Sequence, residues 1–192
     1  EDTTRTISIT SAQIVSTPVQ NVSTIETSSG VVGYMTFNDH IRTAETQLIE
    51  AIKKLQALNI TDLFLDIRYN GGGYLDIANE LSYMIAGDSA AGQIFEELEF
   101  NDQHPDVNPI TGALLRPTEF HTTTQGFSES AGTPLPNLGL ARVFVLTGSG
   151  TCSASESIIN SLRGIDVEVI QVGATSCGKP YGFYPLDNCG TT

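Results

Sequence analysis

Small hydroxyl residues gather at 148–156, where the sequence reads Gly-Ser-Gly-Thr-Cys-Ser-Ala-Ser-Glu. An apolar run at 143–146 precedes this segment and is typical of a buried strand, while Ile158, Ile159 and Leu162 behind it have helical spacing. A turn from strand to helix leaves backbone N–H groups free at the start of the helix. A serine in such a turn can act as a nucleophile, and the neighbouring amides can stabilise an oxyanion.

A basic side chain follows in the sequence. Lys179 comes after a second strand-like run at 167–172. Hydrolysis of a peptide bond needs a nucleophile, a base and donors for the oxyanion, but a lysine in water is protonated at neutral pH and cannot take up a proton. The base must therefore be desolvated. We expect an apolar pocket for it, to which Val172, Phe183 and Tyr184 are suited.

Four motifs in this order resemble those of peptidase family S41, the tail-specific or carboxyl-terminal processing serine–lysine peptidases. They are Val-Gly-Tyr-Met-Thr-Phe at 32–37, Leu-Asp-Ile-Arg-Tyr-Asn-Gly-Gly-Gly at 65–73, Ser-Ala-Ser-Glu at 153–156, and Gly-Lys at 178–179. The resemblance runs from about residue 31 to 185 and is weak between 88 and 140. It implies an α/β fold with a ClpP/crotonase-like core, a largely parallel sheet and flanking helices, interrupted by a long irregular insertion.

The resemblance also implies roles for single residues. Ser153 would be the nucleophile, because the reactive serine of the family lies three positions before the glutamate, here Glu156. Lys179 would be the general base, and Glu156 would orient the lysine or hold a hydrogen-bond network. Some relatives carry a glutamine four residues after the lysine, whereas this chain has Phe183 there. The identity of a third catalytic member therefore stays open.

The oxyanion hole would use backbone N–H groups. Ala154 directly follows the nucleophile, and Gly72, with Gly73 beside it, supplies a main chain that a substrate can approach without meeting a Cβ. Asp66 and Arg68 flank this loop, and we interpret them as a structural pair. The three glycines lack the Gly-Lys-Ser/Thr ending of a phosphate-binding loop and the spacing of a dinucleotide fingerprint.

Other interpretations of these residues stay open. Ser155 and Ser149 are competing nucleophiles, and all of the serines could simply cap the helix. Glu156 could act only on the helix dipole. Lys179 could be an ordinary surface lysine, as most lysines are.

Two different functions are also compatible with the sequence. His40, His104 and His121 permit a Ser–His hydrolase of small esters or amides, although no Gly-x-Ser-x-Gly elbow accompanies Ser153. A non-catalytic domain on the same fold would instead bind peptides or lipophiles. The acidic loop 102–106 is a weak metal candidate, and we predict no metal and no cofactor.

The composition limits the partners. The net charge is −13 with nine Lys and Arg residues, which disfavours nucleic acids and anionic membranes. No apolar run approaches the roughly 18 residues of a membrane span. By resemblance, the substrate is a protein or peptide bound in extended form, and the location is the periplasm, the cell envelope or the secreted space. The oligomeric state cannot be predicted.

The cysteines do not form a zinc pattern. The chain has Cys152, Cys177 and Cys189. Cys177 and Cys189 could pair across a hairpin in an oxidising compartment, or all three could remain free thiols.

The chain length of 192 residues and its 40% hydrophobic content suit one ordered domain. We expect N-terminal strands or a linker over residues 1–30, with short strands at 7–9 and 14–19, leading into the catalytic core at 31–192. The family's PDZ module has no counterpart in this sequence, which we interpret as an internal fragment.

Within the core, the patterns predict strands and helices in alternation. A helix capped by Asn38 or Asp39 should end near Asn59, a strand buried on both faces should span 63–67, and a second helix should be closed by Gly87. The segment 88–140 should be a lid-like excursion that contains a hairpin of 94–100 with 119–124.

Overall fold

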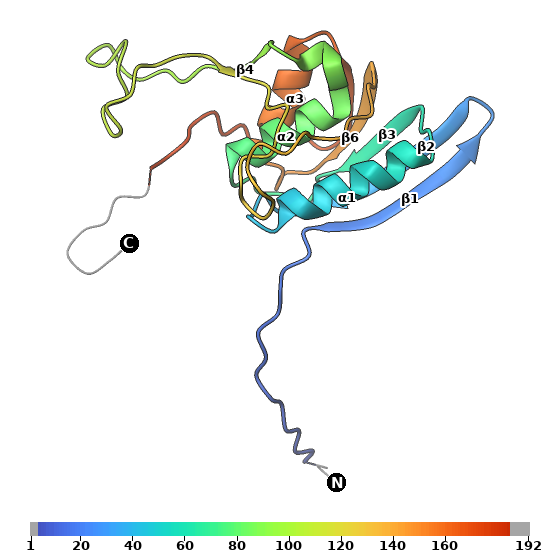
Figure 1. Ribbon diagram of the computed structural model, residues 1–192. Coiled ribbons are helices and arrows are strands. Elements are labelled where there is room, and N and C mark those ends of the chain that lie inside the picture. The colour runs from blue at the N-terminus through green and yellow to red at the C-terminus, as the bar shows by residue number, and fades with distance from the viewer. Residues whose placement is uncertain (1–3, 185–192) are drawn as a thin grey trace.

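Five strands form one sheet in the order β1-β2-β3-β6-β7, and a separate pair joins β4 to β5 (Figure 1). The computed structural model describes residues 4–184. The strands are β1 (Val19–Thr27), β2 (Gly30–Phe37), β3 (Asp62–Asp66), β4 (Ile94–Glu96), β5 (Thr118–Glu119), β6 (Arg142–Thr147) and β7 (Glu168–Gly173). The helices are α1 (Ala44–Ala57), α2 (Leu75–Ala86), the short 3-10 helix η1 (Gly87–Ala90) and α3 (Ala154–Gly164).

The sheet is parallel except at one edge. β1 pairs antiparallel with β2, whereas β2–β3, β3–β6 and β6–β7 are parallel pairs. Parallel strands need crossover connections, which α1, α2 and α3 provide. The predicted α/β fold with a largely parallel sheet is therefore confirmed.

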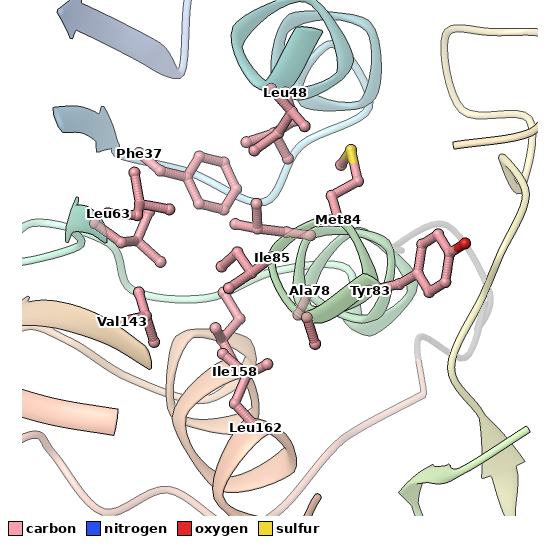
Figure 2. Close-up of a cluster of buried hydrophobic side chains, with 14 of the residues drawn as sticks. Phe37, Leu48, Leu63, Ala78, Tyr83, Met84, Ile85, Val143, Ile158 and Leu162 are labelled. Atoms are coloured by element: carbon pink, nitrogen blue, oxygen red, sulfur yellow. The ribbon is translucent and has the colours of Figure 1, made fainter. Parts of the chain in front are cut away.

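One face of the sheet and the three helices share a single core. Met35 lies opposite Leu65 in the β2–β3 register, and Leu65 lies opposite Val145 in β6. All three side chains are buried. Figure 2 shows side chains that the helices contribute to the same core, among them Leu48 of α1, Met84 of α2 and Ile158 of α3.

The opposite face of the sheet is only half-covered. Strand side chains alternate between faces, so a second row runs through Tyr34, Phe64, Phe144 and Ile170. Phe64 and Phe144 stack with their ring centroids 4.6 Å apart. All four are of intermediate exposure. The expectation that β3 is covered on both faces was therefore wrong, because all three helices pack on one side.

The elements differ from the predicted ones mainly at the N-terminal end. Residues 4–18 contain no strand, so the short strands expected at 7–9 and 14–19 are absent and the first strand begins at Val19. The first helix begins at Ala44 rather than after Asn38 or Asp39. The cause is His40, whose backbone is extended and pairs with Gly73, so the helix starts only beyond this bridge.

The excursion between α2 and β6 has two parts. The segment between β4 and β5 projects away from the rest of the molecule (yellow-green in Figure 1). The β4–β5 pairing, in which Ile94 lies opposite Glu119, confirms the predicted hairpin over a shorter length. After β5, the chain returns to the helices, where the Glu45 carboxylate accepts backbone N–H groups of residues 126, 128 and 129.

Candidate active site

Ser153 is the residue immediately before α3, and its backbone is unusual. Its φ of 57° and ψ of −120° lie in a region that residues with a side chain rarely occupy. Such conformations cost about 1–3 kcal/mol and gather at functional sites. The turn from β6 into α3 thus presents Ser153 in a strained conformation at a helix N-terminus.

Gly72 packs directly against this turn. Its φ is +96°, and a Cβ added to it would lie 2.8 Å from both Ser153 Cβ and Cys152 O, and 3.0 Å from Ala154 N. A side chain at this position would therefore collide with the turn. The structure brings the glycine loop and the serine turn together, as the sequence motifs predicted.

Asn70 fixes the relative position of these two loops. Its Oδ1 accepts the Gly72 N–H at 3.0 Å and the Nδ1–H of buried His40 at 2.9 Å. Its backbone oxygen accepts the Cys152 N–H at 3.2 Å and the Ser155 hydroxyl at 3.0 Å. One asparagine thus joins the glycine loop, the serine turn and the end of β2.

His40 is neutral in this network. Burial lowers its pKa to about 4, despite hydrogen bonds to Asn70 and Gly72 that act in the other direction. Because Asn70 Oδ1 can only accept, the proton of the neutral ring is on Nδ1. His40 therefore acts as a hydrogen-bond donor through Nδ1, and its buried Nε2 has no partner among the described residues.

The oxyanion donors need one correction. The Gly72 N–H is already donated to Asn70 Oδ1, so it is not the free donor that the glycine motif predicted. An asparagine side chain that bonds two residues ahead is a common turn device, and it uses up this amide. Within residues 4–184, the N–H groups of Gly73 and Ala154 have no acceptor.

Glu156 joins the serine turn to the segment that carries the lysine. Its carboxylate accepts the N–H groups of Ser153 at 2.8 Å, Gly178 at 2.7 Å and Lys179 at 2.9 Å. Burial alone would raise the pKa of Glu156, but these bonds and one from the Ser176 side chain hold it below its ordinary value. Glu156 is therefore an ionised anchor for both backbones.

Lys179 is exposed, and the desolvating pocket expected around it is not formed. Its Nζ lies 4.9 Å from the ring centroid of Phe183, which is itself 80% exposed. Val172 and Tyr184 are also exposed. The reason is that residues 174–184 have no regular secondary structure and no layer packs over them.

A cavity of about 600 Å³ lies between the serine turn and the lysine segment. Ser153 and Lys179 both line it. Phe95, Glu96, Glu97 and Leu98 line it from the excursion, and Arg163 lines it from α3. Among the lining residues, all of which lie within the described part of the chain, there is no histidine.

A disulfide lies beside Ser153. Cys152 and Cys177 are bonded, with their Cα atoms 5.3 Å apart. The suggested pairing of Cys177 with Cys189 is therefore wrong for Cys177, and Cys189 lies outside the described residues. The sequence separation of 25 residues concealed the true pair, because strand β7 returns the chain to the start of α3.

Three other residues that the sequence singled out make hydrogen bonds or ion pairs within the fold. Ser155 is buried and donates to Asn70 O, so it is no nucleophile. His121 contacts Asp76 at 2.9 Å. Arg68 donates both Nε and Nη2 to the Asp66 carboxylate, which confirms that predicted pair.

Metal ligation has little support in residues 4–184. The one cluster with metal-ligand spacing there consists of Cys152, Glu156 and Cys177, and its two sulfurs are bonded to each other. The acidic loop 102–106 forms no such cluster. Of the helices in the described range, none is long and apolar enough to cross a membrane.

Comparison with known proteins agrees with this geometry. The model of peptidase family S41 matches residues 30–182. The chain belongs to peptidase family S41. A carboxyl-terminal-processing protease of Picosynechococcus sp. is 27% identical over 181 residues, with 93% of this chain and 36% of that protein covered.

Solved S41 structures share the fold. A Bacteroides fragilis protein described as an S41 protease has a TM-score of 0.74 at 25% identity, with 92% of this chain and 43% of that chain covered. The photosystem II D1 C-terminal processing protease has a TM-score of 0.55 at 17% identity, with 86% and 38% covered, and shows likeness of fold alone. This S41 chain thus spans less than half the length of these relatives.

Proposed function

We propose that this S41 chain carries the catalytic core of a serine endopeptidase. Ser153 attacks the carbonyl carbon of the scissile bond, and Lys179 takes the hydroxyl proton and returns it to the leaving amine. The observation that carries the proposal is the strained backbone of Ser153 at the mouth of a cavity that Lys179 also lines. Strain of this kind is retained where it serves function.

The oxyanion would be bound by two backbone amides. The N–H groups of Ala154 and Gly73 are the available donors, and Gly72 lets the two loops approach because it has no Cβ. The N-terminal end of α3 adds its dipole to the same point. Preorganised donors of this kind are the largest single contribution in many acyl transfers.

Lys179 has to lose water before it can act as a base. We interpret the contact of the Lys179 Nζ with the Phe183 ring as a resting arrangement. An extended peptide laid into the cavity would cover Lys179 and the half-exposed Leu98 together. We propose that substrate binding supplies the desolvation that the chain alone does not.

The relatives and the disulfide support a proposal for the substrate class and the location. The Picosynechococcus homologue is a carboxyl-terminal-processing protease, and we propose C-terminal protein segments as substrates here too. The Cys152–Cys177 bond fits an oxidising compartment such as the periplasm or cell envelope. The proposed organisation is a catalytic core over 31–192, with residues 88–140 flanking the substrate.

A fluorophosphonate probe tests the catalytic assignment. It should label Ser153, as mapped by mass spectrometry, and labelling should disappear in Ser153→Ala and fall by about 100-fold or more in Lys179→Ala. Ser149→Ala and Lys53→Ala are matched controls and should label normally. Normal labelling of Lys179→Ala would refute the proposed base, and loss of labelling in His121→Ala would favour the histidine mechanism instead.

A further inference from the structure

We propose that the Cys152–Cys177 disulfide positions the lysine segment against the nucleophile, so that catalysis by this site requires the oxidised pair. The activity part of this inference rests on the proposed peptidase function. The positioning part concerns the backbone alone and can be measured without any substrate.

The two cysteines stand next to the two catalytic candidates. Cys152 directly precedes Ser153, and Cys177 is two residues before Lys179. Their Cα atoms are 5.3 Å apart. A backbone hydrogen bond also joins the two segments, since the Cys177 N–H donates to Thr151 O at 2.9 Å. A single covalent bond therefore fixes the start of the lysine segment to the serine turn.

The other attachments of the lysine segment are hydrogen bonds. Its backbone leaves β7 through a bond from Ala174 N–H to Thr147 O, and beyond this point it has no regular structure. Gly178 and Lys179 donate to Glu156 from exposed positions, where water competes for the same bonds. Once the disulfide is broken, the restraints left near Lys179 are these solvent-accessible hydrogen bonds and the backbone bond from Cys177 to Thr151.

Reduction is chemically simple here. Cys177 is exposed, so a dithiol such as dithiothreitol can reach its sulfur. The reductant thiolate attacks the S–S bond, the pair takes up two electrons and two protons to become two thiols, and the reductant closes to its cyclic disulfide. The Glu156 carboxylate lies 3.6 Å from Cys177 Sγ.

The first experiment measures positioning by hydrogen exchange. Exchange at the Gly178 and Lys179 amides is followed with and without dithiothreitol, in wild type and in Cys152→Ser and Cys177→Ser. EDTA is present because two free thiols and Glu156 lie within 4.8 Å of one another and could bind trace zinc. We expect exchange to accelerate at least tenfold on reduction and in both variants, and Cys189→Ser to behave as wild type.

The second experiment measures chemistry on the same samples. Reduction should lower the rate of fluorophosphonate labelling and the kcat for a peptide by at least tenfold, with KM little changed, because the cavity wall from the excursion remains. Reoxidation should restore wild type but neither cysteine variant. A purely structural disulfide would instead lower thermal stability and leave kcat intact below the melting point.

The outcomes separate the two proposals. Unchanged exchange at Gly178 and Lys179 on reduction, or a mapped Cys177–Cys189 bond in the native chain, overturns the positioning role. Accelerated exchange with unchanged kcat overturns the dependence of activity on the disulfide. If exchange accelerates but the oxidised chain neither labels nor cleaves, the tether stands and the peptidase proposal fails.

Discussion

Ser153 holds a backbone conformation that costs free energy, and its neighbours compensate for it. The Ser153 N–H is bonded to the Glu156 carboxylate at 2.8 Å, and the preceding Cys152 N–H is bonded to Asn70 O at 3.2 Å. A charge-assisted bond of the first kind contributes about 1.5–3 kcal/mol. This is the size of the strain, so the turn can persist in the absence of substrate.

Replacement of Gly72 by alanine tests the close approach of the two loops. The new Cβ would lie 2.8 Å from Ser153 Cβ, and the φ of +96° disfavours any side chain. We expect Ser153 to move, with fluorophosphonate labelling reduced by about 100-fold, the usual cost of a displacement near 1 Å.

Gly71→Ala is the matched control for this replacement. A Cβ at Gly71 meets nothing within 4 Å, so its labelling rate should equal that of wild type. Equal labelling of Gly72→Ala and Gly71→Ala would show that the two loops can separate at no cost.

For single residues, the sequence predicted which residues come together better than it predicted their hydrogen bonds and exposure. The Asp66–Arg68 pair and the approach of Gly72 to Ser153 follow from motif order, because both motifs end parallel strands at one edge of the sheet. The bond that occupies the Gly72 N–H depends on the rotamer of Asn70, and the exposure of Lys179 depends on what packs over it. Neither quantity is encoded in the spacing of residues.

Among the elements, α1 and α2 are tied to the returning part of the excursion by two carboxylates. Glu45 accepts several backbone N–H groups, and Glu80 accepts the Gln125 N–H at 2.7 Å. Burial, with smaller contributions from Glu45 and Asp76, raises the pKa of Glu80 to about 8, while the hydrogen bonds from residues 126–129 lower that of Glu45 against the effect of burial. Glu80 is therefore the protonated member of the pair at neutral pH.

The stability of the chain should fall as pH rises from 6.5 to 8. Folded Glu80 keeps its proton up to about pH 8, whereas the unfolded chain releases it near 4.5, so folding takes up a proton in this range. His40 acts in the opposite sense, but only between its folded value of about 4 and its unfolded value of 6.5. Urea unfolding at pH 6.5 and at pH 8 measures the difference.

Glu80→Gln is the control, since the amide keeps the size of the protonated acid and does not titrate. The variant should lose most of the decline between pH 6.5 and 8. An equal decline in Glu80→Gln and wild type would assign the effect to other groups, of which Glu96 is the first to test because burial raises its pKa too.

The strand and helix pattern was predictable at the scale of elements, because buried strands and amphipathic helices have different periods. The start of α1 was not, because the bridge between His40 and Gly73 joins residues far apart in the chain. Residues 4–18 show that composition alone does not make a strand. Their apolar residues have strand-like composition, but they have no neighbouring strand to pair with.

For the molecule as a whole, charge is the dominant long-range property. The chain has a net charge of −13. Its cavity is lined by three acidic residues, Glu96, Glu97 and Glu156, and by two basic ones, Arg163 and Lys179. A strongly charged surface steers oppositely charged ligands, and salt screens this steering over about 10 Å at 0.1 M. The approach of basic peptides should therefore be favoured.

Two peptides that share a cleavage sequence and differ in Lys or Glu flanks test this steering. The Lys-flanked peptide should have the higher kcat/KM at low ionic strength, by about tenfold or more, and the ratio should shrink toward one at high ionic strength. A ratio that is insensitive to salt would place the selectivity in direct contacts within the cavity instead.

The bond between Cys152 and Cys177 also has a topological effect. Residues 152–177 form a closed covalent loop that contains the whole of α3 and β7. A backbone break in the short turn at 165–167 would open this loop without dividing the molecule. The halves bearing Ser153 and Lys179 would remain one covalent species, and reduction of the disulfide would release them as two polypeptides.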